Sequence, residues 1–390
     1  MFDNLKVLEL ASVLAGPSVG QFFAELGAEV IKVENTHTNG DVTRTWKVKG
    51  EMTDDRSSYF CSVNWGKKSI AVDLSSAKGK DIVHALVKKS DVVIVSYKSG
   101  DAEKLSVDYK TLASLNPTLI YGQITGYGSH NPRVGYDAVI QAEAGFMFMN
   151  GEVGGASLKM PVALMDIIAA HQLKEGILLA LLKKEKTGEG EFVEVSLIQS
   201  AISSLANQAT NWLVAGSIPQ KQGSAHPNIA PYGDIFQTAD NKEVLLAIGS
   251  NRQFEALCTI LGIPEISADA GYKSNQIRVE NRASLNAILQ QRIADVNMAA
   301  FSEALDAANI PFGIIKNMPE VFEMPEAKSL FLHSGDRKGI KTYVGRNLSG
   351  DRSHFLPPPS FGEHTYDVLS KSLEIPPEQI KTLVKDGTVI

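Results

Sequence analysis

Residues 6–34, KVLELASVLAGPSVGQFFAELGAEVIKVE, decide the fold. Lys6 to Ala11 and Glu29 to Glu34 have the apolar composition of strands, and Gly16 to Leu26 between them predicts a helix that ends at Gly27. Two strands joined by a helix form a βαβ unit, in which the strands run parallel. The turn before the helix lacks the glycine spacing of a dinucleotide-binding fingerprint, so we do not expect a nicotinamide cofactor.

The same rhythm continues along the chain. After a polar, loop-like segment at 35–58, strands and helices are predicted in alternation at 68–74, 76–89, 91–97, 109–115 and 118–125. This alternation predicts an α/β fold with a doubly wound parallel sheet. Ligands of such sheets bind beyond the carboxyl ends of the strands.

Further elements are expected in the second half. The pattern predicts helices at 135–150 and 197–214, a strand at 192–195, a hairpin at 233–238 and 243–248 with a possible third strand at 311–316, and helices at 252–261, 282–294, 298–308, 366–373 and 377–385. The change of rhythm after a turn-rich stretch at 216–228 indicates a second, smaller α+β domain.

Composition excludes several classes of protein. The chain has 390 residues, a formal net charge of -6 and 44% apolar residues, which describes a globular protein without a basic surface for nucleic acid. Cys61 and Cys258 alone cannot form a disulfide framework, and no run of about 20 apolar residues could span a membrane. We expect a cytoplasmic protein with no metal site.

A second informative stretch is Met160 to Val195, which reads as an extended segment, a long helix, a glycine-containing turn and a strand. Asp166 is the only acidic residue between Leu158 and Leu173, and it falls where the first amide groups of the helix are unpaired. Those amide groups would favour an ionised carboxylate. From this stretch alone, an ordinary N-cap is the more frequent use of such an aspartate.

Several catalytic motifs are absent from the sequence. There is no G-x-S-x-G nucleophile elbow, no Walker loop and no H-x-x-x-H pair among the eight histidines. What remains is carboxylate chemistry, in which an ionised aspartate attacks an activated acyl group.

The sequence resembles the class III CoA-transferases, the family that includes carnitine and formyl-CoA transferases and the methylacyl-CoA racemases. The similarity covers nearly the whole chain, in ten separated motifs in the same order. They are LAGPSVGQFFAELGAEVIKVE (14–34), GDVTRTW (40–46), YFCSVNWGKKSIAVDL (59–74), SDVVIVSYKSG (90–100), NPTLIYGQITGYG (116–128), GYDAVIQAEAG (135–145), Asp166 with its helix, TGEGEFVEVSL (187–197), GSAHPNIAPYG (223–233) and PSFGEHTYDVL (359–369).

The resemblance implies a Rossmann-like large domain built from both chain ends, 1–200 and 330–390, with linkers at 201–224 and 311–329 and a small α+β domain at 225–310. It also implies an interlocked homodimer, with the C-terminal PSFGEHT segment returning to the N-terminal half. The substrates would be an acyl-CoA and a small carboxylic acid, with no separate cofactor. Asp166 matches the catalytic aspartate, and the CoA-binding positions match Val13, Leu14, Ala15, Val72, Asp73, Leu74, Ser75, Ser96, Tyr97, Lys98, Lys104, Tyr136 and Asp137.

Two other functions stay open at this point. Racemases of this fold carry a histidine where this chain has Tyr136, and a phenol with a pKa near ~10 is a poor proton carrier at neutral pH, which favours transfer over 2-methylacyl-CoA epimerisation. A CoA-binding protein without turnover is the other alternative. Ser96, Ser99 and Asn35 depart from common family residues, and these departures argue against oxalate and formate as substrates.

Overall fold

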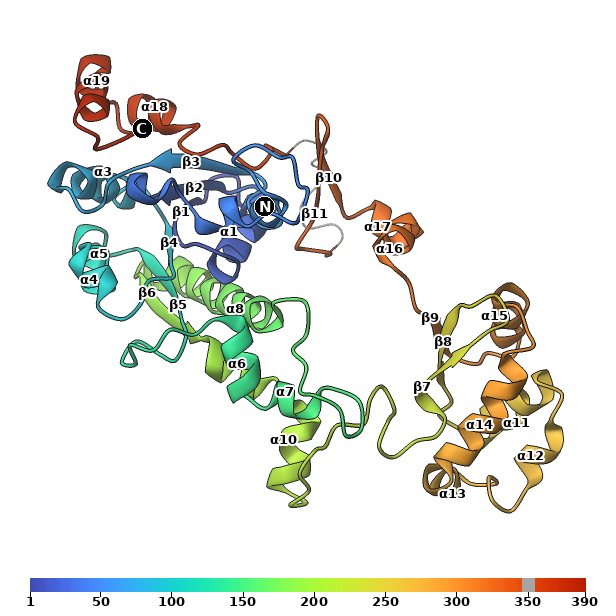
Figure 1. Cartoon of the computed structure of the whole chain (residues 1–390). Helices are drawn as coiled ribbons and strands as arrows, with labels where there is room; N and C mark the ends of the chain where they lie inside the picture. The colour runs from blue at the N-terminus through green and yellow to red at the C-terminus, as the bar shows by residue number, and fades with distance from the viewer. Residues whose placement is uncertain (346–354) are drawn as a thin grey trace. The chain divides into compact units, whose positions relative to one another are not determined.

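The computed structural model describes residues 1–345 and 355–390. Its largest sheet has six parallel strands in the order β3-β2-β1-β4-β5-β6 (Figure 1). This is the order of a doubly wound Rossmann sheet, with a switch point between β1 and β4, so the predicted parallel α/β sheet is confirmed. The strands are β1 Lys6–Leu10, β2 Glu29–Glu34, β3 Lys67–Ala71, β4 Val92–Val95, β5 Ile120–Thr125 and β6 Glu191–Ser196.

Both faces of this sheet are buried. In β4, Val92 and Ile94 pack into one apolar core, and Val93 and Val95 pack into another on the opposite face. The first core is completed by α1 Ala15–Glu25, α6 Asp137–Glu143, α8 Leu164–Thr187 and α9 Leu197–Ser203. The second is completed by α3 Ala77–Val87, α5 Tyr109–Leu115, the π-helical turn η3 Val368–Ser372 and α19 Pro377–Lys385.

Helix α8 packs along the first core. Leu173 and Ile177 are fully buried, as their helical spacing predicts, and Gly188 ends the helix in a left-handed conformation. The same helical spacing also predicts that Lys174 lies toward the polar side, and this prediction is wrong, because the lysine is buried over the ring of Phe22. Burial lowers the pKa of its ammonium to about 8.

Two predicted helices are broken. The stretch 135–150 forms α6 and the short α7 Phe146–Met149, because Gly145 between them has a φ of 87°. The stretch 197–214 forms α9 and α10 Ala206–Leu213, and Ala206, with a φ of 48°, interrupts the right-handed helix. The predicted helix at 366–373 is a short turn, α18 Thr365–Asp367, continued by η3.

The end of the chain contacts the N-terminal strands. Gly66 donates its N–H to the Leu356 carbonyl, His364 donates its own to the Ser69 carbonyl, and Val72 pairs with Val389. The loop 35–58 contains two short 3-10 helices, η1 Thr36–Thr38 and η2 Val42–Thr45, and α2 Ser58–Cys61 follows it. Other short elements of this unit are α4 Asp101–Lys104 and the antiparallel pair β10 Phe331–Ser334 and β11 Arg337–Ile340.

A second compact unit has its own apolar core. The strands β7 Tyr232–Gln237, β8 Glu243–Ala247 and β9 Phe312–Ile314 form an antiparallel sheet, which confirms the hairpin and the third strand. Its helices are α11 Asn251–Ile260, α12 Pro264–Ala268, α13 Asn275–Glu280, α14 Arg282–Ile293, α15 Met298–Ala307, α16 Met318–Glu323 and α17 Pro325–Lys328.

The observed units differ in detail from the predicted domains. The large unit comprises 1–146, 159–215 and 329–390, and the small unit comprises 147–158 and 216–328. The predicted linkers therefore contain regular elements: the end of α9 and all of α10 lie in one, and β9, α16 and α17 lie in the other. Residues 346–354 of the predicted C-terminal part lie outside the described residues.

The packing of α19 generates a first prediction. Leu383 is buried in the second core, whereas its neighbour Val384 is 52% exposed. Replacing Leu383 by alanine should lower the free energy of unfolding by about 2–5 kcal/mol, because it leaves a cavity under the sheet. Val384→Ala should change it by less than about 0.5 kcal/mol in the same urea titration. Equal effects of the two changes would contradict the placement of the chain end in this core.

Candidate active site

A cleft of about 250 Å³ opens where the first, fourth and fifth strands of the sheet end. Its lining includes the turn Ser12–Gly16 after β1, Ser96–Ser99 after β4, Ile124–Gly126 at the end of β5, and Asp166 in the first turn of α8. This is the carboxyl edge of the sheet, at its switch point, where ligands of doubly wound folds bind.

The turn after β1 brings backbone amide groups to the cleft. Ser12 donates its N–H to the Ser96 hydroxyl at 3.2 Å, which ties the turn to the end of β4. Helix α1 begins at Ala15 without a side-chain cap, and both Ala15 and Gly16 line the cleft. Amide groups at an uncapped helix start favour a negatively charged ligand group.

Asp166 is buried, with 8% of its surface exposed, and it lines the cleft. Helix α8 begins at Leu164 after Ala163, so Asp166 lies in the first turn and is not the N-cap that one reading of the sequence suggested. Asp137 holds the helix start instead: its carboxylate accepts the Met165 N–H at 2.8 Å and the Gln141 amide at 2.6 Å.

The expected preference of Asp166 for ionisation is wrong. Burial, and secondarily the charge of the neighbouring Asp137, raise the pKa of the Asp166 carboxyl to about 7. The Met165 amide at this helix start is bound by Asp137. Near pH 7, Asp166 is therefore only partly ionised, and its carboxylate form is a stronger base than that of an ordinary aspartate.

One wall of the cleft depends on two glycines. A Cβ on Gly126 would lie 2.6 Å from the Gly135 nitrogen, and a Cβ on Gly135 would lie 2.5 Å from the Gly126 Cα. The two backbones are therefore in direct contact, which places Tyr136 and Asp137 beside the end of β5.

The cleft brings together a majority of the residues predicted from the sequence. These are Val13, Leu14, Ala15, Ser96, Tyr97, Lys98, Tyr136, Asp137 and Asp166.

Five predicted CoA-binding residues lie outside its lining. Val72 and Leu74 are buried in the second core, while Asp73 accepts hydrogen bonds from Ser75 and forms an ion pair with His37 at 3.2 Å. Lys104 pairs with Asp101 on the surface of α4. Contact of all these residues with CoA stays a prediction.

Sequence reasoning assigned no role to two residues near the cleft. Asp41 is 4% exposed and accepts the Val13 N–H. Tyr59 lies close enough to Asp166 and Asp137 for their charges to change the pKa of its hydroxyl. Burial and these carboxylates raise the pKa of Tyr59 to about 12, so it remains a neutral hydrogen-bond donor. Both residues stand in motifs of the family resemblance, GDVTRTW and YFCSVNW, which were the available signal.

The described residues contain neither a group of side chains suited to a metal ion nor a helix suited to a membrane. Within residues 1–345 and 355–390, no three histidine, cysteine or acidic side chains are grouped so that they could hold a metal ion. In the same residues, no helix has the length and apolar character needed to cross a bilayer.

The chain is similar to known proteins in both sequence and structure. The profile of CoA-transferase family III matches residues 2–365. The succinate–glutarate CoA-transferase of Agrobacterium fabrum is 36% identical in an alignment that covers 95% of each chain. The human succinyl-CoA:glutarate CoA-transferase is 34% identical over 99% of this chain and 89% of that one. The crystal structure of a CAIB/BAIF family protein from Brucella suis superposes with a TM-score of 0.84 at 36% identity, covering 95% of this chain and 98% of that one.

The raised pKa of Asp166 predicts a pH dependence of stability. The folded protein keeps the Asp166 proton up to about pH 7, whereas the unfolded chain releases it near the ordinary pKa of 3.8. Relative to Asp166→Asn, the natural protein should therefore lose stability as the pH rises from about 4 to 7, by on the order of 4 kcal/mol at most.

Urea unfolding of both proteins at several pH values measures this difference. Asp137→Asn should lessen it, because the carboxylate that repels Asp166 is removed. A stability difference between the natural protein and Asp166→Asn that does not change with pH would contradict the raised pKa.

Proposed function

Because the chain belongs to CoA-transferase family III and is a CoA-transferase, we propose that it moves CoA from an acyl-CoA to a carboxylic acid through covalent intermediates on Asp166. The observation that carries this proposal is the position of Asp166, a buried carboxylate in the cleft at the switch point of the sheet. Asp137 is the only other carboxylate in the described lining of this cleft, and its oxygens already accept hydrogen bonds from Met165 and Gln141.

The reaction begins with attack by the Asp166 carboxylate on the thioester carbonyl of the donor. The C–S bond breaks, CoA leaves as a thiolate, and a mixed anhydride joins the donor acyl group to Asp166. The thiolate then attacks the Asp166 carbonyl of this anhydride, so that the donor acid leaves and an aspartyl-CoA thioester remains. The acceptor carboxylate repeats these steps in reverse, and Asp166 is regenerated.

Each attack creates a negatively charged tetrahedral oxygen, which requires hydrogen-bond donors. The amide groups of Ala15 and Gly16 support this role, because they lie at the uncapped start of α1 and line the same cleft as Asp166. The long CoA chain supplies binding energy that fixes the thioester beside the carboxylate. Such positioning can lower a barrier by up to about 7–11 kcal/mol.

The relatives indicate the substrate class. Two of them, at 36% and 34% identity over nearly the whole chain, are named for succinate or succinyl-CoA and glutarate. We infer that the donor and the acceptor here are likewise short dicarboxylic acids, with succinyl-CoA and glutarate as the first pair to assay.

Epimerisation of a 2-methylacyl-CoA is less well supported. Tyr136 lies in the cleft where a racemase of this fold has histidine, and the relatives compared above are named CoA-transferases. α-Hydrogen exchange of an acyl-CoA in deuterated water, without an acceptor acid, would favour the epimerase.

Trapping should identify the nucleophile. Incubation with succinyl-CoA and then hydroxylamine should convert Asp166 to a hydroxamate that peptide mass spectrometry detects. Asp166→Asn should lose transfer to glutarate by on the order of 10³-fold or more, because its amide cannot attack the thioester. Asp367→Asn, a change on an exposed helix, is the matched control and should behave as the natural protein. A CoA-binding protein without turnover would give no modified aspartate.

We further propose that the protein is an interlocked homodimer. Helix α10 has no buried residue, and it ends in Trp212, Leu213 and Val214, which are 55%, 76% and 84% exposed. Contiguous exposed apolar side chains of this kind support coverage by a second copy of the chain.

Interlocked subunits predict a dimer that persists on dilution. Since a topological link cannot be undone by weakening a surface, dissociation should coincide with unfolding. Analytical ultracentrifugation at nanomolar concentration measures this. A folded monomer under those conditions would contradict the interlocked dimer and would leave the role of Asp166 unaffected.

A further inference from the structure

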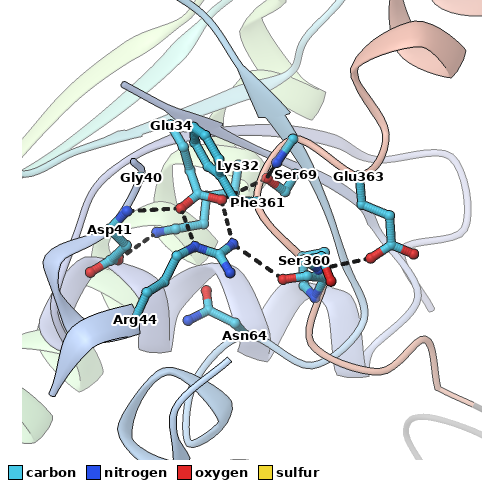
Figure 2. Close-up of polar contacts among 12 residues, drawn as sticks. Lys32, Glu34, Gly40, Asp41, Arg44, Asn64, Ser69, Ser360, Phe361 and Glu363 are labelled. Carbon is cyan, nitrogen blue, oxygen red and sulfur yellow. Dashed lines mark hydrogen bonds and ion pairs between the residues drawn. The ribbon is translucent and has the colours of Figure 1, made fainter. Parts of the chain in front are cut away.

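We propose that Asp41, together with Lys32, is a positioning residue that holds the turn Ser12–Gly16 in the shape that lines the cleft beside Asp166. This inference rests on the proposed function, because it assigns a role in CoA transfer to residues that touch neither Asp166 nor the reacting atoms. The groups concerned belong to a buried network of charged side chains, part of which is shown in Figure 2.

The turn contains a strained residue. Val13 has a φ of 71°, in the left-handed region, and it is the only β-branched residue with a positive φ in the part of the chain that the structure describes. A branched side chain disfavours this conformation because its Cβ substituents crowd the backbone. The turn would therefore relax to another shape if nothing held it.

Asp41 supplies a direct hold on Val13. Both of its carboxylate oxygens lie within hydrogen-bond distance of the Val13 N–H, at 3.2 and 3.3 Å. The other neighbours of this carboxylate are also donors: the Thr43 N–H at 3.0 Å, the Thr43 hydroxyl at 2.8 Å and the Lys32 ammonium at 2.9 Å. An ionised carboxylate is the side chain that such a set of donors requires.

Two buried lysines donate hydrogen bonds to the backbone on either side of Val13. Lys32 donates to the Ala11 carbonyl at 2.7 Å and pairs with Glu9 at 3.0 Å, while Lys67 donates to the Pro17 carbonyl at 2.9 Å and pairs with Glu9 at 2.7 Å. The backbone is thus held before, at and after the strained residue. All four charged side chains are at most 4% exposed.

Glu34 and Arg44 hold the loop that carries Asp41. Glu34 accepts the Asp41 N–H at 2.8 Å and pairs with Arg44 at 2.6 Å, as Figure 2 shows. Arg44 donates to the Pro359 carbonyl, so the C-terminal segment also supports the loop. A buried ion pair is weak evidence for stability, since its desolvation is costly. This network surrounds a strained turn in the active-site cleft, so a role in fixing the geometry of the turn explains it better than a contribution to stability does.

A double-mutant cycle separates positioning from a purely structural role. Asp41→Asn is combined with Val13→Gly, which adopts a positive φ without a steric cost, and with Val13→Ala, which removes the same methyl groups but keeps the Cβ. Whichever way the side-chain amide of Asp41→Asn is oriented, its NH2 group replaces an oxygen that accepted a hydrogen bond and so faces another donor. We expect Asp41→Asn to lower kcat for transfer from succinyl-CoA to glutarate by about 10- to 100-fold, with a smaller change in KM.

The decisive readout is the dependence of this loss on residue 13. The loss should shrink at least about fivefold in the Val13→Gly background and should persist in the Val13→Ala background. Equal losses in all three backgrounds would overturn the proposal. Should Asp41→Asn fail to fold, Thr43→Val removes one donor of the same carboxylate, keeps the ion pair, and enters the same cycle with the same expected pattern.

A second measurement keeps this test independent of the proposed function. Calorimetry of CoA binding to the same variants needs no turnover, and Asp41→Asn should weaken binding in a way that Val13→Gly restores and Val13→Ala does not. If the natural protein transfers no CoA between these substrates, the proposed function fails while the binding cycle still decides the role of Asp41. Unchanged CoA affinity in Asp41→Asn, together with an unchanged kcat, would overturn the positioning role.

Discussion

The charge of Lys32 is the constraint on which the cleft depends. The Lys32 side chain is 1% exposed on β2, which lies between β3 and β1 in the sheet, so its charge must be paired within the protein. Burial alone would lower its pKa, but the charges of Asp41, Glu9 and Glu34 more than offset this effect and hold the pKa above its usual range. One cation thereby fixes β1, the turn after it and the loop that follows β2.

The layers of the large unit could be predicted because their signals are local. Alternating apolar strands and helices at 6–34 and 68–125 specify a parallel sheet, and the run VVIV in β4 reflects burial on both faces. The helix breaks at Gly145 and Ala206 could not be predicted from the pattern of apolar residues, because each depends on one backbone angle. The grouping of 147–158 with the small unit depends on long-range contacts and has no local pattern.

The site was predictable in its residues and not in its electrostatics. The family resemblance pointed to Asp166, but the rule that helix starts favour carboxylate ions failed there, because burial and the negative charge of Asp137 raise the pKa of this carboxyl. Asp41 was overlooked for a related reason. Its importance follows from Lys32 and from the positive φ of Val13, and neither is visible before the strands are placed side by side.

The central claim, that an oxygen of Asp166 takes part in the covalent chemistry, is tested most directly with glutarate labelled with 18O in its carboxylates. When CoA thiolate attacks the glutaryl carbonyl of the mixed anhydride, the bridging oxygen stays on Asp166, and the next turnover passes it to the released succinate. Repeated turnover should therefore place 18O in the peptide that contains Asp166 and in succinate. An unlabelled Asp166 after many turnovers, with labelled succinate, would mean that glutarate attacks succinyl-CoA directly and would contradict this account.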